Sequence, residues 1–551
     1  MRRTLFLELL TLTAIIFLVA CSPESSTEPT YTDAPKTTND DETITPTPVR
    51  VFVNNQTLFT TAGGAWARKF EDTRGVGSFQ ILNDEDIITG ELTEEGRAMQ
   101  ALKYQRTNFY IYAFRAKTMT KPNLDAPDFR HYNLVNVEDP NGHAPAASLA
   151  DTKDQWHCLL DGQDYYKGLL ANLNMDYDDN GDMFLLKTPL GPNYSGERKC
   201  IYWPERVDVG YNFFAYSVGD ISTDDFSTDD KSVDWGQCER LEDQVVYRNF
   251  TVDGSQDVMA GYAPPIKYVL SSVPNLTDTE REQIQQFGYS TFAAQRGIDP
   301  MINLRHLLTR IKFQALPGGE SASKTTIDAI YVRCHNKGDF VVAHRDTTQV
   351  GFYPYENQVS DVYVHDKPVI QQDGNGKQYL QPSQIHDTSV YTPENGNVDE
   401  LTDDMLWRVE WKDEYYVRDA NGHPIDRKPL NQRGEPVHLG DNLMVPPSEY
   451  LDIYIKSTYK LGEPDEHKFI NHYTINAADL VESNPNREKY YLDDDYFKKT
   501  GEKRYIFKPG YFYVITHVVY GISQSRAYAY VDAWKEGDTE IMMDERPGGG
   551  Q

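Results

Sequence analysis

The sequence predicts an all-β protein built from antiparallel β-sandwiches. Segments rich in Tyr, Phe, Val and Ile, the residues favoured in strands, recur along the chain. Clusters of Gly, Pro, Asn and Asp, which favour turns, separate them. Few stretches have a helical pattern, which argues against an alternating α/β fold. The clearest strand segments are Phe109–Phe114, Tyr211–Tyr216, Ile327–Val332, Tyr450–Ile455 and Tyr511–Tyr520.

The chain begins with the features of an export signal. Arg2 and Arg3 precede an apolar run, Thr4–Val19, which is too short to span a membrane. The run ends in Leu-Val-Ala before Cys21, which resembles the lipobox of bacterial lipoproteins. We therefore expect residues 1–20 to be a lipoprotein signal peptide and the Cys21 thiol to carry a diacylglyceryl group. An ordinary signal peptide with a chance cysteine is the alternative.

A polar segment and a first strand follow the signal. Residues 21–48 are rich in Ser, Thr, Pro and acidic residues and have little to bury, so we expect a disordered tether. Val49, Val51 and Val53 then alternate with an arginine and a phenylalanine. This alternation places the three valines on one side of a strand.

Length and turn signals indicate how the rest is divided. The 551 residues suffice for two or three domains. We expect an N-terminal sandwich over 49–276 and a C-terminal sandwich over 300–551. A polar connector, 277–299, lies between them and is helical over Thr277–Gln286; Thr93–Leu102 is the other helical stretch. The second half has two long polar insertions, 371–404 and 419–440, and loops of that length are usually either functional or mobile.

Charge and cysteines limit the partners. The net charge of -30 repels phosphate backbones, so nucleic acid is excluded as the main partner. Cys158, Cys200, Cys238 and Cys334 allow three disulfide pairings, and the sequence does not choose among them. Unpaired buried thiols are an equal interpretation.

One acidic segment has a partial metal-binding pattern. Asp176, Asp178, Asn180 and Asp182 fit the start of a calcium loop, in which carboxylates at alternate positions wrap a hard cation. Lys187 stands where that loop needs a bidentate glutamate, so an acidic turn is favoured over calcium. The histidines have no metal-ligand spacing. We therefore predict no metal, no cofactor and no catalytic residues.

Three other features are assigned mainly to packing. His306 precedes two leucines in a strand-like run, so a packed histidine is favoured. Cys334 and His335 are adjacent in a strand and point to opposite faces, so they do not form a nucleophile pair. Trp407 and Trp411, beside an insertion, are the best candidates for an exposed sugar-stacking site, although a place in the core is favoured.

Several phrases in order carry a family resemblance, which covers about residues 50–540. They are Tyr202–Pro204, Phe213–Tyr216, Gln256–Ala260, Leu304–Phe313, Asn442–Pro447, Lys508–Tyr511 and Val531–Trp534. Behind a lipobox, this order resembles the fimbrillin superfamily of the Bacteroidetes, the pilins of the type V pilus. Length and loop size are most similar to the accessory tip subunits of the major fimbriae, the FimC, FimD and FimE group.

The resemblance implies a fold and an assembly mechanism. Members have two transthyretin-like β-sandwich domains and reach the outer membrane as lipoproteins. In members that polymerise, an arginine-specific protease cuts near the first strand and removes it with the lipid. A C-terminal strand of another subunit then fills the open groove by strand addition.

Candidate residues for these steps can be named in this chain. Arg50, Arg68 and Arg74 flank the first strand and are the candidate cut sites. Arg50 adjoins the tether, whereas a cut after either later arginine would remove the whole strand. The strand-exchange candidates are Val49, Val51 and Val53 at one end and Tyr528 and Tyr530 at the other. The tail after Trp534 is polar, which makes it a poor donor and favours an accessory role over stalk polymerisation.

We therefore expect a non-enzymatic accessory subunit of cell-surface fimbriae. Its partners would be stalk and accessory fimbrial subunits, host matrix or bacterial surface ligands, and the outer membrane through the lipid. A permanently lipid-anchored glycan-binding lipoprotein is the alternative. A secreted hydrolase with an unrecognised site is the third hypothesis.

Overall fold

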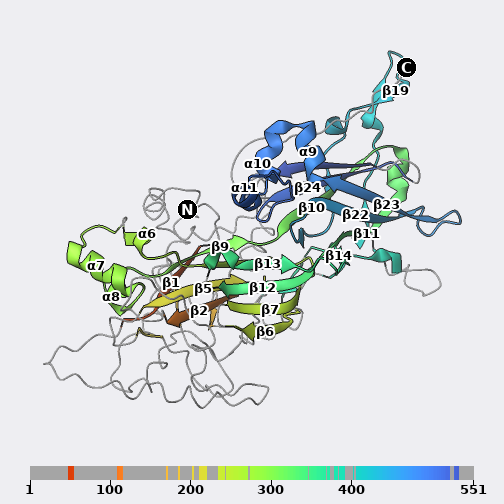
Figure 1. Ribbon diagram of the computed structural model, residues 1–551. Coiled ribbons are helices and arrows are strands. Elements are labelled where there is room, and N and C mark those ends of the chain that lie inside the picture. Colours follow the sequence, from red (N-terminus) through yellow and green to blue (C-terminus); the bar gives the residue numbers. More distant parts are fainter. Residues whose placement is uncertain are drawn as a thin grey trace, which may run out of the picture. The chain divides into compact units, whose positions relative to one another are not determined.

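The computed structural model describes most of the second half of the chain and the strands of the first half (Figure 1). The described residues are 47–54, 108–115, 169–171, 184–186, 201–203, 210–219, 234–241, 244–270, 273–344, 346–367, 369–372, 378–381, 384–390, 401–402, 405–521 and 526–532. Among them no helix is long and apolar enough to cross a membrane. The predicted helix at Thr93–Leu102 lies outside this set.

Sheet A contains seven strands and is built from the first half of the chain. Its order is β3-β2-β5-β8-β9-β1-β4. Neighbours pair antiparallel except β1 and β9, which are parallel and far apart in the sequence. The strands are β1 (Arg50–Asn54), β2 (Phe109–Arg115), β3 (Leu169–Ala171), β4 (Phe184–Leu185), β5 (Tyr211–Ser217), β8 (Met259–Tyr262) and β9 (Met301–His306).

Sheet B packs against one face of sheet A. Its order is β13-β12-β7-β6. Tyr110, Tyr112 and Tyr216 of sheet A share a buried core with Tyr247 and Phe340 of sheet B. The strands are β6 (Gln237–Arg240), β7 (Gln244–Thr251), β12 (Lys337–His344) and β13 (Gly351–Pro354).

Short helices pack against the other face of sheet A. They are α6 (Lys267–Leu270), α7 (Asp278–Phe287) and α8 (Thr291–Ala294). Thr277 caps α7: its hydroxyl accepts from the Glu280 N–H, and the Glu280 carboxylate accepts from the Thr277 N–H. Ile284 on α7 belongs to the same buried cluster as Val51 of β1.

Sheets C and D form a second sandwich. Sheet C has the order β20-β10-β24-β25, with β21 also paired to β10, and sheet D has the order β14-β11-β22-β23, with β17 also paired to β11. The strands of sheet C are β10 (Thr309–Pro317), β20 (Val437–His438), β21 (Leu443–Val445), β24 (Phe512–Val519) and β25 (Arg526–Asp532). Those of sheet D are β11 (Thr325–Cys334), β14 (Ser360–Tyr363), β17 (Trp407–Arg408), β22 (Tyr450–Tyr459) and β23 (His467–Asn476).

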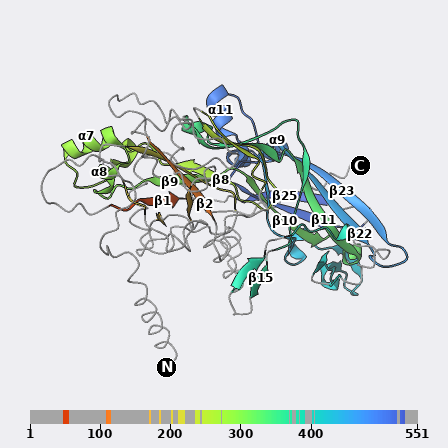
Figure 2. The same cartoon turned by 90° about the horizontal axis from the view of Figure 1, so that it is seen from below.

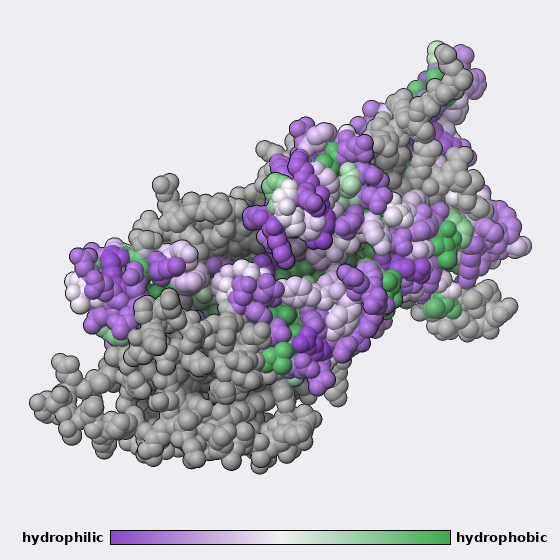
Figure 3. All heavy atoms as spheres, in the orientation of Figure 1, coloured by the Kyte–Doolittle hydropathy of each residue, from purple (hydrophilic) through white to green (hydrophobic). Residues whose placement is uncertain are grey.

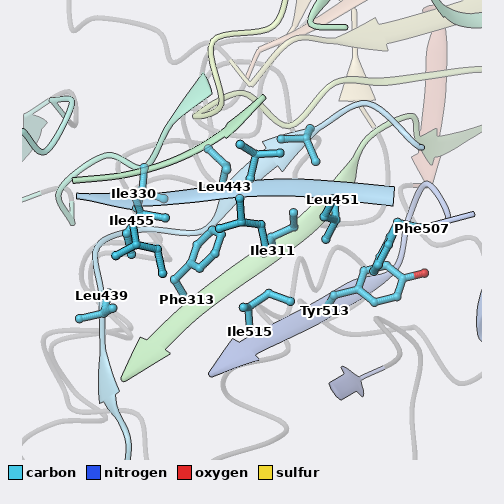
Figure 4. Packing of buried hydrophobic residues seen from close by; sticks show 14 of the residues in the cluster. Ile311, Phe313, Ile330, Leu439, Leu443, Leu451, Ile455, Phe507, Tyr513 and Ile515 are labelled. Atoms are coloured by element: carbon cyan, nitrogen blue, oxygen red, sulfur yellow. The ribbon is translucent and has the colours of Figure 1, made fainter. Parts of the chain in front are cut away.

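The core of this second sandwich lies between sheets C and D. Phe313 and Ile515 of sheet C pack with Ile330 and Ile455 of sheet D (Figure 4). Tyr491 of α10 belongs to the same cluster. The helices here are α9 (Ala477–Ser483), α10 (Glu488–Tyr491) and α11 (Asp494–Thr500).

The all-β prediction is confirmed. Each of the five strand segments named from sequence corresponds to a strand, and the longest described helix has only ten residues. The expected connector, 277–299, holds α7 and α8, while β12 and β13, later in the chain, pair within sheet B. The division into domains at that segment stays a prediction.

The two predicted insertions coincide in part with hairpins. One hairpin joins β15 (Val369–Gln372) to β16 (Gln378–Gln381), and the other joins β18 (Tyr416–Arg418) to β19 (Pro424–Arg427). Figure 3 shows one face of the molecule, on which hydrophilic residues cover most of the coloured surface and apolar patches are small.

Candidate functional site

The first strand, β1, lies inside sheet A rather than at its edge. On one side it pairs antiparallel with β4, where Arg50 lies opposite Leu185. On the other side it pairs parallel with β9, where Phe52 lies opposite Met301. The Phe52 N–H donates to the carbonyl of Pro300 at 2.9 Å, which is where contact with the β9 segment begins.

The residues just before β1 are held by a separate segment. The Val49 N–H donates to the Ile201 carbonyl at 2.8 Å, and the Trp203 N–H donates to the Thr47 carbonyl at 2.9 Å. The Val49 carbonyl accepts from the Leu186 N–H at 3.1 Å. The first half of the Thr47–Asn54 segment is therefore held on the β4 side, and its second half on the β9 side.

The side chains of β1 divide between core and solvent. Val49 and Val51 are both 0% exposed, in a cluster with Leu186 and Ile302. Arg50, between them, is exposed. Full burial of a valine contributes about 1.5–3 kcal/mol relative to exposure. Val51 of β1 and Val49, just before the strand, therefore both contribute to this core.

The other proposed exchange residues lie in a different sheet. Tyr528 is opposite Thr516 and Tyr530 is opposite Val514 in the pairing of β25 with β24. Because β25 is the end strand of sheet C and β1 is an inner strand of sheet A, the chain does not bring the two candidate exchange strands together. Val53 pairs with Ile302 in β9.

Several predicted site residues lie outside the described residues. These are Cys21, Arg68, Arg74, the acidic segment with Asp176, Asp178, Asn180 and Asp182, and two of the cysteines, Cys158 and Cys200. Their roles stay predictions. Within the described ranges, no group of three or more His, Cys, Asp or Glu side chains could hold a metal ion.

The two candidate tryptophans are engaged with neighbouring side chains. Trp407 stacks on His386 with ring centroids 3.6 Å apart and an interplanar angle of 7°. The Trp411 ring lies beneath two guanidinium groups, those of Arg427 at 5.8 Å and Arg433 at 5.6 Å. Arg433 also donates to the carbonyls of Pro317 and Gly318, so this cluster attaches the β18–β19 region to the end of β10.

The candidate histidines and the candidate cysteine are engaged in packing contacts or polar contacts with neighbouring residues. The His306 side chain is 9% exposed, with Nδ1 2.8 Å from Asp257 Oδ1. Cys334 packs against the sheet C–sheet D core, and burial raises the pKa of its thiol to about 12. His335 Nδ1 lies 3.0 Å from the Gln358 carbonyl instead. A thiol with a raised pKa is a poor nucleophile at neutral pH.

The partners of β1 are the functional residues that the sequence did not indicate. Ile201–Trp203, Leu186 and β9 hold the strand, but they are far from it in the chain. The alternating valines indicated that a strand exists and which face it buries. Nothing in a single sequence indicates which distant segments pair with it.

Comparisons with known proteins complete the description. The chain matches no family model and no curated protein. Among solved structures it is similar to a fimbrial protein from Bacteroides vulgatus, with 11% identity, a TM-score of 0.29, and 79% of this chain and 96% of that chain covered. Two Porphyromonas gingivalis proteins are also similar: the fimbrial anchor protein Mfa2 (9% identity, TM-score 0.24, 78% and 90% covered) and a C-terminally truncated form of the tip fimbrial protein Mfa3 (8% identity, TM-score 0.24, 79% and 96% covered). All three of these similar chains are fimbrial proteins of Bacteroidetes.

Proposed function

We propose that this protein is a non-enzymatic accessory subunit at the tip of cell-surface fimbriae. It is exported as a lipoprotein through Cys21 and assembled by strand addition after proteolysis near β1. Its partners are other fimbrial subunits and surface ligands of host matrix or bacteria. The proposal rests on the ordered phrases of the sequence and on one structural observation: β1, next to the proposed tether, is a short inner strand of sheet A.

The position of β1 explains why its removal would create a binding groove. Loss of the strand would leave the edges of β9 and β4 facing each other without a partner. It would also uncover the cluster that Val49 and Val51 fill. A strand from another subunit, with apolar side chains at alternate positions, would restore both the hydrogen bonds and the core.

The pairing also indicates what each cut would do. Cleavage after Arg50 removes the Thr47–Val49 pairing but leaves Phe52–Asn54 beside β9. It also places a charged amino terminus on Val51, whose side chain is fully buried, and burying a charge is costly. We therefore expect the remaining residues of β1 to leave the sheet, so that a cut after Arg50 opens nearly the same groove as a later cut.

The mature N-terminus tests the proposal. Mass spectrometry of the protein from purified surface fibres should find an N-terminus at Val51, or after Arg68 or Arg74. Arg50→Lys should block cleavage at the first site because the protease is arginine-specific, and it keeps the charge. Arg68→Lys and Arg74→Lys test the two later candidate sites in the same way. An acylated Cys21 on protein that is absent from fibres would contradict the proposal and favour the anchored glycan-binding lipoprotein.

A further inference from the structure

The open edge of sheet D is formed by β23, which lacks most of the usual protections of an edge strand. It pairs with β22 over all ten residues, with no shift of register, and ends the sheet (Figure 2). Natural edges are protected by shortness, proline, bulges, charged side chains or a covering helix or loop. β23 has one lysine, Lys468, whose ammonium group donates to the Ser389 carbonyl. β23 is long, has no proline and no bulge, and has no charge among its inward residues, which are Phe469, Asn471, Tyr473 and Ile475.

The register shows which backbone groups face outward. The Ala477 N–H donates to the Glu449 carbonyl at 2.9 Å, so these two residues form a hydrogen-bonded pair. Such pairs alternate along an antiparallel ladder. Odd-numbered residues of β23 therefore bond to β22, and the even-numbered residues direct their N–H and C=O groups to the open edge. In the described parts of the chain, these outward groups of residues 468–474 have no hydrogen-bond partner.

Two polar side chains along the same strand also have unfilled hydrogen-bonding capacity within the described residues. Among the residues that the structure describes, the buried amide nitrogen of Asn471 and the buried hydroxyl of Tyr473 have no hydrogen-bond partner. A buried polar group in this state costs about 1–3 kcal/mol. On the outward face, the Ile470 side chain is 58% exposed. Along this edge, backbone groups and one side-chain amide lack hydrogen-bond partners among the described residues, and an apolar side chain is exposed.

We propose that β23 pairs antiparallel with β23 of a second copy of this chain, with Asn471 opposite Asn471 on the two-fold axis. Such an interface uses the same surface on both copies. Directly opposed Cβ atoms lie about 4.5–5.5 Å apart, so each Asn471 amide comes within reach of the other. The strand's own sequence places Phe469 opposite Tyr473, an aromatic cross-strand pair, on both sides of the axis.

The aromatic pairs favour this register over its neighbours. With Asn471 at the centre, Lys468 lies opposite Thr474 and Ile470 opposite His472. Centring on Ile470 instead would oppose Phe469 with Asn471, and centring on His472 would oppose Phe469 with Ile475. The edge therefore forms an aromatic pair on both sides of the axis in one register, which favours a second copy as the occupant.

A cysteine crosslink tests both the partner and the register. In the purified full-length chain, Asn471→Cys should form an intermolecular disulfide on mild oxidation. Opposed Cα atoms at a non-hydrogen-bonded position are about 4.5 Å apart, within the range of a disulfide. Thr474→Cys, on the same strand but opposite Lys468, is the control and should form none. Peptide mass spectrometry should identify a link between two residues at position 471.

A second measurement is independent of the introduced thiol. Light scattering should give the wild type twice the mass of one chain at micromolar concentration, and Ile470→Lys, which sets a lysine opposite His472, should halve it. Ile425→Lys, on β19 with a side chain 64% exposed, should leave the mass unchanged. A wild type that stays at single-chain mass and gives no 471–471 link overturns the proposal. A link from position 471 to a different polypeptide also overturns it.

Discussion

Sheets A and D are built from similar β-prone sequences but are buried differently. In β2 of sheet A, all six residues of Phe109–Phe114 are buried. In β23 of sheet D, no residue is buried, and inward and outward positions alternate in exposure. Sheet A has sheet B on one face and helices α6–α8 on the other, whereas sheet D has sheet C on one face and, among the described residues, the short segment with Asp387 and Thr388 against part of the other.

The aromatic residues show what this difference means. In sheet A, the tyrosines of β2 and β5 pack against sheet B. In sheet D, an outward row of rings crosses the four strands: Tyr363, Tyr331, Tyr454 and His472, with successive centroids 4.9, 5.0 and 4.2 Å apart. The first pair is tilted and the other two are stacked. That row ends at the open edge. Sheet A, covered on both faces, tolerates little change, while sheet D leaves part of a face and an edge available for contacts.

The largest expected effect is at an inner strand of the doubly covered sheet. Val51→Asp places a carboxylate in a fully buried site within an apolar cluster. We expect a loss of more than about 4 kcal/mol in the free energy of unfolding, enough to prevent folding. Arg50→Asp, one residue away and exposed, should change it by less than about 0.5 kcal/mol. Denaturant titration of both variants checks this, and equal effects would mean that β1 is not an inner strand.

The alternation of valines and an arginine predicted this contrast between neighbours. Strand existence and the buried face follow from local pattern, because side chains alternate across a strand whatever it pairs with. The parallel pairing of β1 with β9, and the pairing of β12 with β7, could not be predicted. Each joins segments far apart in the chain, and neither carries a local signal. For the same reason, Tyr202–Pro204 contributes to the family resemblance, but the bond between the neighbouring Ile201 and Val49 could not be predicted.

A covered position on sheet D should produce the next largest effect, and it depends on pH. Asp328 on β11 is 2% exposed, and its carboxylate accepts from the hydroxyls of Thr458 at 2.6 Å and Thr388 at 3.3 Å. Burial raises its pKa from 3.8 to about 6. Because the unfolded chain ionises first as pH rises, this group destabilises the fold progressively from about pH 4 to about pH 6.

Asp328→Asn removes that ionisation and keeps the shape. Relative to the wild type, its free energy of unfolding should rise by up to about 3 kcal/mol between pH 4 and pH 7, the free energy that corresponds to a pKa raised from 3.8 to about 6. Denaturant titrations at pH 4, 5.5 and 7 measure the difference in free energy of unfolding between the variant and the wild type. The contributions of other titrating groups cancel in that difference. A constant difference across pH would show that Asp328 is not buried as a neutral acid.

A smaller effect tests the helical cover of sheet A. Thr277→Ala removes the hydroxyl that caps α7 and should cost about 1 kcal/mol. The backbone N–H of Thr277 lowers the pKa of Glu280 to about 2, so this part of the cap is present at neutral pH and is lost as pH falls from about 4.5 towards 2. Thr279→Ala, exposed and inside the same helix, is the control and should cost nothing, because alanine has the higher helix propensity. Equal costs would mean that the capping hydroxyl does not stabilise α7.

The smallest effect on stability is expected at the open edge, where the largest effect on association is also expected. Ile470 is exposed and its side chain points away from the core, so Ile470→Lys should change the free energy of unfolding of a single chain by less than about 0.5 kcal/mol. Denaturant titration at low protein concentration, where the copies are separated, measures this change.

At high protein concentration only the wild type should gain stability, because association stabilises the folded state by mass action. If Ile470→Lys unfolds as easily as Val51→Asp, the contrast between the two sheets fails. If wild type and variant gain equally with concentration, β23 is not the edge through which copies pair.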